Sequence, residues 1–229
     1  MTRRPGMTTD DCNDAAPPRQ VEFWLDFGSN YSYLSAMRIE AAAQQLGLTV
    51  AWRPFLLGPI FKSFGWDSSP FVLQKEKGAY MWRDMERQCA KHGLPWRKPS
   101  VFPRSAVLPM RVAAAHAEQP WIGAYCRETM RLNFALDRDL DSEDSVAGVL
   151  RGLGLPAAEL IDAARDGPRR GRLRELTAEA QRRGLFGAPS LFARGELFWG
   201  NDRLDDALAF AAQGTAGRVR PTDTARWPQ

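Results

Sequence analysis

The sequence has few of the residues that build metal sites and disulfide frameworks. Its 229 residues include 3 cysteines and 2 histidines. Cys12, Cys89 and Cys126 lie far apart and form no CxxC motif, and His92 and His116 are equally isolated. Zinc sites and disulfide scaffolds need these residues at close, recurring spacings. The pattern argues against both, and Cys89 and Cys126, which fall in helical patterns, are better interpreted as small core residues.

Long apolar runs are also missing. No stretch approaches the roughly 20 residues of a membrane-spanning helix, and residues 1–20 lack the apolar segment of a secretory signal. We therefore expect a cytoplasmic protein with no membrane partner. Residues 1–20 are predicted to be a disordered leader, and the sequence leaves open whether Met1 or Met7 is the start.

Charge of one sign is not concentrated anywhere in the chain. The formal net charge is +4, and the densest basic group, residues 165–176, is interleaved with Asp166 and Glu175. A nucleic-acid-binding face gathers its Lys and Arg on one surface. The mixed pattern favours a solvated helix face, and we expect no nucleic-acid partner.

The two ends of the chain carry strand patterns. The apolar run 21–27 ends at Gly28 and predicts a buried strand, a helical pattern follows from Tyr31 to Leu46, and 48–55 predicts a second strand that closes a βαβ unit. Near the other end, 187–200 predicts two strands joined at Arg194 and Gly195, followed by a helix over 202–213. Asp202 is placed to cap that helix.

The middle of the chain is predicted to be helical. Residues 56–70 are rich in Gly, Pro, Ser and aromatic residues and indicate a long loop, which in a compact domain tends to be functional. Helical patterns follow at 75–91, 105–117, 120–136, 143–152, 156–165 and 169–184. The predicted architecture is therefore an α/β frame of βαβ and ββα units over 21–213 with an all-helical insertion at about 75–184, and 214–229 is a predicted flexible tail.

This order of elements resembles the thioredoxin-like plan of DsbA-like proteins. The segment "DFGSNYSYL" resembles the "DFxSPYSYL" signature of the 2-hydroxychromene-2-carboxylate isomerases and the kappa-class glutathione transferases. Five further motifs resemble that family in its order and spacing: "WRPFLLGPIFKSFG", "KGAYMWRDMER", "FPRSAVLPMR", "GLFGAPSLF" and "ELFWGNDRL". The ordered set covers about residues 21–212. "SNYS" occupies the position of the redox CxxC, which excludes dithiol chemistry there.

The resemblance implies that Ser29 is catalytic. A Ser before a helix can also be a simple cap for backbone amides, and the sequence alone leaves both interpretations open. In the role that the resemblance implies, the Ser29 hydroxyl donates a hydrogen bond to the sulfur of bound glutathione and stabilises its thiolate. Lowering the pKa of a thiol from about 8.5 by about two units needs roughly 2.7 kcal/mol, and a hydrogen bond to a charged group contributes about 1.5 to 3 kcal/mol.

The resemblance also implies a cofactor site for glutathione. Pro189 matches the family's cis-proline loop, and Ala188 before it offers backbone groups to the cysteinyl unit. Asn201, Asp202 and Arg203 match the γ-glutamyl end, and Lys77 matches a lysine that pairs with the glycyl carboxylate. Without the resemblance, Lys77 would be a solvated helix residue.

On the substrate side, the resemblance implies an aromatic carboxylate or another small electrophile. Lys62 would attract the carboxylate, Phe64 and Trp66 would stack on the ring, and Arg104 and Ser105 are weaker candidates of the same kind. The implied reaction is the isomerisation of 2-hydroxychromene-2-carboxylate, in which glutathione is not consumed, in the catabolism of aromatic compounds. The resemblance further implies a homodimer.

Two residues depart from the family pattern. Asn30 replaces the proline after the catalytic Ser, so that Asn30 itself could be the cap, and Trp66 replaces an asparagine that contacts ligand. Two other functions therefore remain open: a kappa-like glutathione transferase or peroxidase, which would consume glutathione, and a DsbA-like binding scaffold without catalysis.

Overall fold

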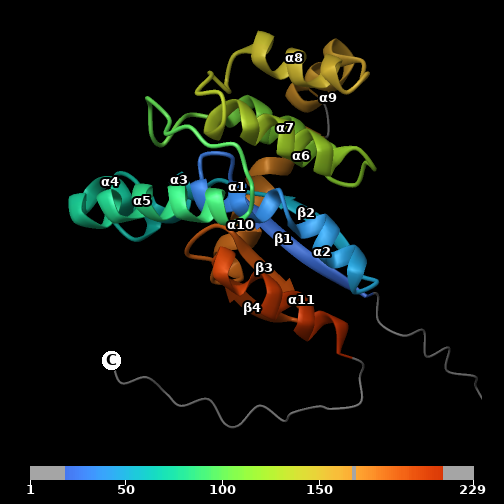
Figure 1. The fold of residues 1–229 in the computed structure, drawn as a ribbon. Coiled ribbons are helices and arrows are strands. Elements are labelled where there is room, and N and C mark those ends of the chain that lie inside the picture. Colours follow the sequence, from blue (N-terminus) through green and yellow to red (C-terminus); the bar gives the residue numbers. More distant parts are fainter. Residues whose placement is uncertain (1–18, 167–168, 214–229) are drawn as a thin grey trace, which may run out of the picture.

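The chain folds as a DsbA-like thioredoxin fold with a mixed four-stranded sheet and a large helical part (Figure 1). The computed structural model describes residues 19–166 and 169–213. The predictions for Cys12, the leader and the tail lie outside these residues. The elements run in the order β1 (Gln20–Leu25), α1 (Asn30–Ala36), α2 (Ile39–Gln45), β2 (Thr49–Pro54), α3 (Leu57–Ser63), α4 (Pro70–Leu73), α5 (Lys75–Lys91), α6 (Val107–Ala115), α7 (Ile122–Phe134), α8 (Glu143–Gly152), α9 (Ala157–Arg165), α10 (Arg172–Arg182), β3 (Ser190–Ala193), β4 (Glu196–Trp199), the 3₁₀ helix η2 (Asn201–Arg203) and α11 (Leu204–Ala212).

The sheet brings the two ends of the described chain together. Its strand order is β2-β1-β3-β4, with β1 parallel to β2 and antiparallel to β3. Since a parallel pair needs a crossover, α1 and α2 connect β1 to β2. The β3–β4 hairpin turns through Arg194 and Gly195, both at positive φ (51° and 87°), as a two-residue hairpin loop of the primed type requires.

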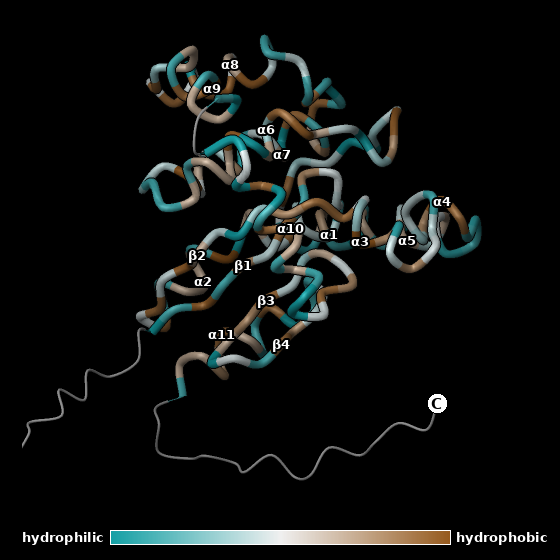
Figure 2. The backbone as a smooth tube through the Cα atoms, turned by 180° about the vertical axis from the view of Figure 1, so that it is seen from behind, coloured by the Kyte–Doolittle hydropathy of each residue, from teal (hydrophilic) through white to brown (hydrophobic). Residues whose placement is uncertain are grey.

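The core is built around β1, which is an inner strand. Phe23, Trp24 and Leu25 are fully buried, and the Phe23 ring meets Trp52 of β2 edge-on at a centroid distance of 5.2 Å. Figure 2 shows hydrophobic stretches along α6 and β3, the elements that surround this core. In the part of the chain that the structure describes, no helix has the length and apolar character needed to cross a membrane.

Three predictions about the elements are wrong. The segment from Tyr31 to Leu46, predicted as one helix, forms two helices with a break at Arg38. At the break, the Arg38 N–H donates to the Ser35 carbonyl oxygen (3.0 Å), and the Arg38 guanidinium donates hydrogen bonds to Asn201 and Asp205. The sequence has neither Gly nor Pro at this break. The other two errors concern the segment after β2 and the start of α11.

The segment 56–70, predicted as a loop, contains α3, so that the helical part begins at Leu57 and not near residue 75. Pro59 is tolerated because it lies in the first turn, where its missing N–H costs no hydrogen bond. The cap comes from a distant residue: the Asp26 carboxylate accepts the Leu57 N–H at 2.8 Å. A distant cap of this kind leaves no local pattern in the sequence.

Asp202 does not cap the last helix. The 3₁₀ turn η2 precedes α11, the residue before α11 is Arg203, and no side-chain cap is formed there. The Asp202 carboxylate instead accepts hydrogen bonds from the Arg203 guanidinium. The remaining helix and strand predictions agree with the structure to within about three residues at each end.

Candidate active site

A cleft of about 1230 Å³ opens where the N-terminus of α1 meets the loop before β3. Its walls come from α3, α5, the segment before α6 and η2, so that residues far apart in the sequence meet there. All but one of the predicted site residues line this cleft: Ser29, Lys62, Trp66, Lys77, Arg104, Ser105, Ala188, Pro189, Asn201, Asp202 and Arg203. The exception is Phe64.

Ser29 is both the N-cap of α1 and a cleft residue. Its hydroxyl oxygen accepts the Ser32 N–H at 3.2 Å, and its O–H donates to the Ala188 carbonyl oxygen at 2.9 Å. Only 7% of its surface is exposed. The capping interpretation is therefore correct, and Ser29 in addition joins α1 to the loop before β3.

Two hydrogen bonds and one close backbone approach fix the short turn that carries Ser29. The Asp26 carboxylate accepts the Gly28 N–H at 2.7 Å, and the Asn133 amide of α7 donates to the Phe27 carbonyl oxygen at 3.2 Å. A Cβ on Gly28 would lie 3.3 Å from the Arg104 carbonyl oxygen, so that glycine allows a close backbone approach here. Burial raises the pKa of Asp26, while the N–H groups of Leu57 and Gly28 act in the opposite direction.

Asn30 is not the cap. It is the first residue of α1, it is buried, and its amide nitrogen contacts the Met81 sulfur of α5. Asn30 therefore packs between α1 and α5, and Ser29 caps α1 although the next residue is not a proline.

The loop opposite Ser29 has the cis peptide that the family pattern implies. The Ala188–Pro189 bond is cis, and the Pro189 carbonyl oxygen accepts the Gly200 N–H at 2.9 Å. Gly200 has φ 109°, a conformation that side chains other than glycine rarely adopt. The cis-proline loop is thus tied to the turn that leads into η2.

Residues of η2 form the polar end of the cleft. Asn201 accepts hydrogen bonds through its side-chain oxygen from Ser35 (3.0 Å) and Arg38 (3.3 Å), and this arrangement leaves its amide NH₂ group as a donor. The Arg203 guanidinium pairs with Asp202 (3.2 Å) and Asp206 (2.8 Å). The hydrogen bonds to Asp202 are the main cause of a raised Arg203 pKa.

Of the three lysines that line the cleft, the two predicted as site residues, Lys62 and Lys77, come from different helices. Lys62 is in the last turn of α3, and the ion pairs of the described residues do not include it. Lys77 is in the first turn of α5, and its ammonium group lies over the Phe71 ring at 5.8 Å. Lys62 and Lys77 therefore present positive charges to a ligand from separate walls of the cleft.

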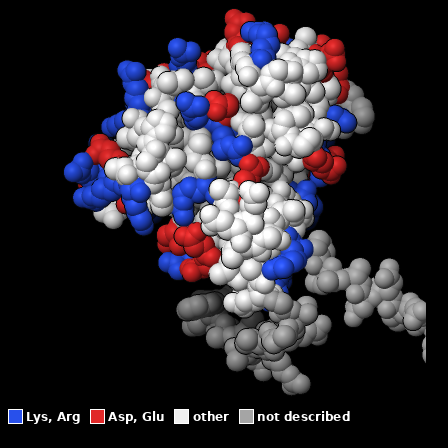
Figure 3. Space-filling model, turned by 45° about the vertical axis from the view of Figure 1, so that its right-hand side comes forward, with Lys and Arg blue, Asp and Glu red and all other residues white. Residues whose placement is uncertain are grey.

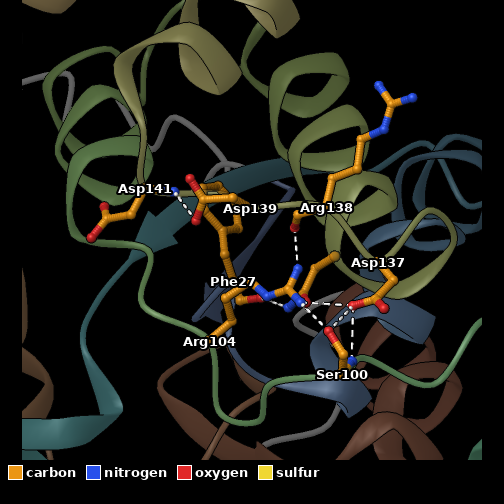
Figure 4. A network of polar contacts seen from close by, with 8 residues as sticks. Phe27, Ser100, Arg104, Asp137, Arg138, Asp139 and Asp141 are labelled. Atoms are coloured by element: carbon orange, nitrogen blue, oxygen red, sulfur yellow. Dashed lines mark hydrogen bonds and ion pairs between the residues drawn. The ribbon is translucent and has the colours of Figure 1, made fainter.

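Arg104 and Ser105 line the cleft, and their polar groups also have partners within the protein. The Arg104 guanidinium is largely buried and pairs with Asp137 at 2.7 Å, and it also donates to Ser100 and to the Arg138 carbonyl oxygen (Figure 4). The Ser105 hydroxyl donates to Asp141. The polar groups of both residues therefore bind the loop between α7 and α8. The local pattern of the sequence does not indicate these partners, because they lie more than 30 residues away.

Phe64 is outside the cleft. It lines a second, smaller cavity together with Phe186, and its ring packs edge-on against Trp66 at 5.7 Å. Trp66 does line the cleft. Phe64 is the C-cap residue that follows α3, whereas Lys62, which lines the cleft, is in the last turn of the helix.

Several cleft residues were missed by sequence reasoning. Tyr31 donates to Asp84 at 2.8 Å, and its pKa is raised, first by burial and then by Asp84. His92 lines the same cleft, and its pKa is lowered by burial and by Arg38 and Lys91. Phe186 and Trp199 lie inside the quoted motifs "GLFGAPSLF" and "ELFWGNDRL", so that the signal was present but was attributed to other residues of these motifs.

The two described cysteines lie in the core, as predicted. Cys89 and Cys126 are buried free thiols, and burial raises the pKa of Cys89 to about 11 and that of Cys126 well above its usual value. Thiols of this kind are poor nucleophiles at neutral pH. Within residues 19–166 and 169–213, no group of three or more His, Cys, Asp or Glu side chains is arranged to hold a metal ion.

Comparisons with known proteins agree with this geometry. The family model described as a DSBA-like thioredoxin domain matches residues 20–210. A 2-hydroxychromene-2-carboxylate isomerase of Sphingobium xenophagum is 30% identical over 191 residues, which cover 82% of this chain and 95% of the relative. The kappa 1 glutathione S-transferase of Rattus norvegicus is 25% identical over 223 residues, or 91% of this chain and 98% of the relative.

A solved structure supports the same assignment. The structure of a 2-hydroxychromene-2-carboxylate isomerase matches with a TM-score of 0.73 and 26% identity, and covers 81% of this chain and 90% of the other. The chain therefore belongs to the DSBA-like thioredoxin family, in the group that contains the 2-hydroxychromene-2-carboxylate isomerases and the kappa-class glutathione transferases. The named members of this group are enzymes, and the chain is an enzyme of this family.

Proposed function

We propose that this protein is a glutathione-dependent isomerase that acts on 2-hydroxychromene-2-carboxylate or a similar aromatic carboxylate. The observation that carries the proposal is the place of the Ser29 hydroxyl, at the start of α1 and 2.9 Å from the Ala188 carbonyl oxygen of the cis-proline loop, inside the cleft. The likeness to named isomerases supports the choice of reaction.

The residues of the cleft fit glutathione. The cleft volume of about 1230 Å³ exceeds the usual range for one small ligand, about 300 to 1000 Å³. The cleft therefore has room for a tripeptide and a second molecule. The Ala188 backbone would pair with the cysteinyl unit, Lys77 with the glycyl carboxylate, and Asp202 with the γ-glutamyl ammonium group. The Asn201 NH₂ group adds a donor at that same end.

When bound, glutathione would supply a thiolate that adds to the double bond of the substrate and is released again unchanged. Ser29 prepares the cleft for this anion. Once the Ala188 carbonyl oxygen accepts an N–H from a ligand, the Ser29 O–H is free to donate to the sulfur. The Ser32 N–H, which donates to the Ser29 oxygen, polarises the hydroxyl and strengthens its donation.

The energy available from Ser29 is of the right size. A fall of about two units in a thiol pKa needs roughly 2.7 kcal/mol, and a hydrogen bond to a charged group contributes about 1.5 to 3 kcal/mol. The α1 helix has only 7 residues, so its dipole lies at the lower end of the range of about 0.3 to 1 kcal/mol. The hydroxyl therefore supplies most of the stabilisation of the thiolate.

The substrate would occupy the side of the cleft formed by α3. Lys62 has no carboxylate partner among the described residues and would pair with the substrate carboxylate. The Trp66 ring would stack on the aromatic part of the substrate. Arg104 and Ser105 would not bind the substrate carboxylate, because their polar groups are already bound by the α7–α8 loop.

Titration calorimetry with glutathione tests the proposal. We expect wild-type protein to release a proton on binding near neutral pH, because the thiol ionises in the site, and we expect Ser29→Ala to bind without this release. Ser142→Ala is the matched control: Ser142 caps α8 through a 3.2 Å bond from the Ser145 N–H, the same geometry as in the Ser29 cap, but it lies outside the cleft.

The outcomes separate the possible functions. Proton release in wild type and Ser142→Ala, lost in Ser29→Ala, supports thiolate stabilisation. Isomerisation of 2-hydroxychromene-2-carboxylate with the glutathione concentration unchanged then supports the isomerase, whereas consumption of glutathione with an electrophile or a peroxide indicates a kappa-like transferase or peroxidase. The absence of binding at millimolar glutathione contradicts the proposal and favours a binding scaffold.

A further inference from the structure

Five aromatic side chains line the cleft or the small cavity beside it, in two groups of packed rings. We define this aromatic rim as Phe61, Phe64, Trp66, Phe186 and Trp199. Phe61, Trp66, Phe186 and Trp199 line the cleft, and Phe64 and Phe186 line the small cavity beside it. The rim thus joins α3 and the turn after it to the segment that precedes the cis-proline loop and to the end of β4.

The rings of the rim are exposed although they pack on one another. Phe64, Trp66, Phe186 and Trp199 are exposed by 50%, 40%, 44% and 51%. Trp66 lies 5.9 Å from Phe61, and Phe186 lies 4.8 Å from Trp199 between ring centroids. Single exposed hydrophobic residues are common, but two groups of packed, exposed rings that line the same cleft indicate a binding surface.

Trp199 is held in place by a glycine. A Cβ at Gly187 would overlap the Trp199 indole nitrogen, so the indole lies directly on the backbone beside the cis-proline loop. Trp199 is therefore both half-exposed and fixed. An exposed ring that is already fixed loses little side-chain entropy when a ligand stacks on it.

A positive charge lies beside the rim. Lys62 follows Phe61 directly in α3, lines the cleft and has no carboxylate partner among the described residues. A ligand that combines an anionic group with a flat apolar body matches this arrangement. A polypeptide partner is less well suited, because the rim continues into the cleft that contains Ser29 and Ala188.

We propose that the aromatic rim selects aromatic carboxylates with three or more fused rings, whose carboxylate pairs with Lys62 and whose distal rings stack on Trp66 and Trp199. This inference rests on the proposed function for the reaction, and it goes further by assigning the size class of the substrate. A two-ring acid reaches only Lys62 and Trp66. A longer acid also covers Phe186 and Trp199, which removes more apolar surface from water.

Direct binding of unreactive acids tests the size preference. Naphthalene-2-carboxylate and anthracene-2-carboxylate are titrated into the full chain by calorimetry, without glutathione. We expect the three-ring acid to bind more tightly than the two-ring acid. The double variant Phe186→Ala/Trp199→Ala should reduce this ratio by about threefold to tenfold for each stacked ring removed, while Trp66→Phe, which retains a ring, should preserve it.

Tyr80→Ala is the control, because Tyr80 is a 64% exposed aromatic residue of α5 that does not line the cleft. Equal affinities of the wild type for both acids, or a double variant no different from Tyr80→Ala, overturn the proposal. The proposal is also overturned if the double variant changes the sedimentation mass but not the ratio of the affinities for the two acids. That result would identify the rim as an interface between copies of the chain. The single variant Trp199→Ala provides a second test if the double variant fails to fold, because Trp199 is half-exposed.

The binding ratio separates this inference from the proposed function. A three-ring preference without any isomerase activity supports the rim and contradicts the reaction. Turnover of the two-ring chromene carboxylate at the same kcat/KM as its benzo-fused homologue supports the reaction and contradicts the rim.

Discussion

At the scale of single residues, a glycine in α5 controls the distance between two walls of the cleft. A Cβ on Gly78 would overlap the Phe71 carbonyl oxygen of α4. Phe71 lies under the Lys77 ammonium group and lines the cleft. The missing side chain therefore allows α4 to lie directly on α5, and this contact positions the lysine that we propose for the glycyl carboxylate.

Gly78→Ala should destabilise the protein and weaken glutathione binding, because the new methyl group forces α4 away from α5. Gly148→Ala is the matched control in α8, where no atom lies within 4 Å of the new Cβ. Replacing a helical glycine stabilises by about 0.5 to 1 kcal/mol when space permits. Thermal unfolding and calorimetry of both variants check the prediction, and equal effects of the two substitutions would contradict it.

At the scale of elements, an ion pair between two loops holds the segment before α6, which lines the cleft. Arg104 and Asp137 join the segment before α6 to the turn after α7, and Asp137 holds a positive φ of 53° in that turn (Figure 4). The Arg104 carbonyl oxygen faces Gly28, next to Ser29. The pair thus determines where the backbone beside the catalytic candidate lies.

Arg104→Ala and Asp137→Ala should each lower the thermal midpoint, and the double variant should lose less than the sum of the two, because residues that interact directly are not additive. We expect the affinity for an aromatic carboxylate to change far less in Arg104→Ala than in Lys62→Ala. A double-mutant cycle measured by thermal unfolding, with carboxylate titrations alongside, checks both points. Strict additivity, or a greater loss of carboxylate affinity at Arg104, would support a direct substrate role instead.

The elements also show what the sequence could predict and what it could not. The strands, most helices, the hairpin turn and the place of Ser29 followed from local periodicity and turn chemistry together with the family resemblance. The break at Arg38, the helix α3 and the partners of Arg104 depend on contacts with Asn201, Asp26 and Asp137. Because these partners are distant in the chain, no local pattern indicates them.

At the scale of the whole molecule, the charge is spread over the surface. The face in Figure 3 carries Lys and Arg together with Asp and Glu, in agreement with basic residues that are solvated. The helical part contains a buried histidine: His116, between α6 and α7, donates to the Leu160 carbonyl oxygen of α9 (3.2 Å) and accepts from Arg169 (3.2 Å). Burial lowers the pKa of His116 below 6.5.

This His makes the folded state sensitive to acid. Since its pKa is lower in the folded than in the unfolded chain, the unfolded state binds more protons as the pH falls below 6.5, and the free energy of unfolding decreases. We expect stability to be greatest above pH 6.5 and to decline toward pH 5 in wild type, and His116→Gln to decline less. Denaturant unfolding of both proteins, measured at several pH values across this range, checks the prediction.

The second histidine provides the control. His92 also has a lowered pKa, but it lies at the end of α5 and lines the cleft. The sequence contains 2 histidines, so the double variant His92→Gln/His116→Gln removes both contributions. If the stability of His116→Gln fell between pH 7 and pH 5 as much as that of wild type, His116 would not be the source of the acid sensitivity.

The sheet order has a consequence for the newly synthesised chain. β1 becomes an inner strand only when Val21 to Trp24 pair with Ser190 to Ala193, and the Ser29–Ala188 hydrogen bond spans 159 residues. During translation, the edge of β1 that pairs with β3 therefore stays unpaired while the helical part is synthesised. Unpaired strand edges invite association with other chains. Ribosome-bound chains that end before β3 should therefore recruit chaperones, and release of these chaperones should coincide with the emergence of the hairpin.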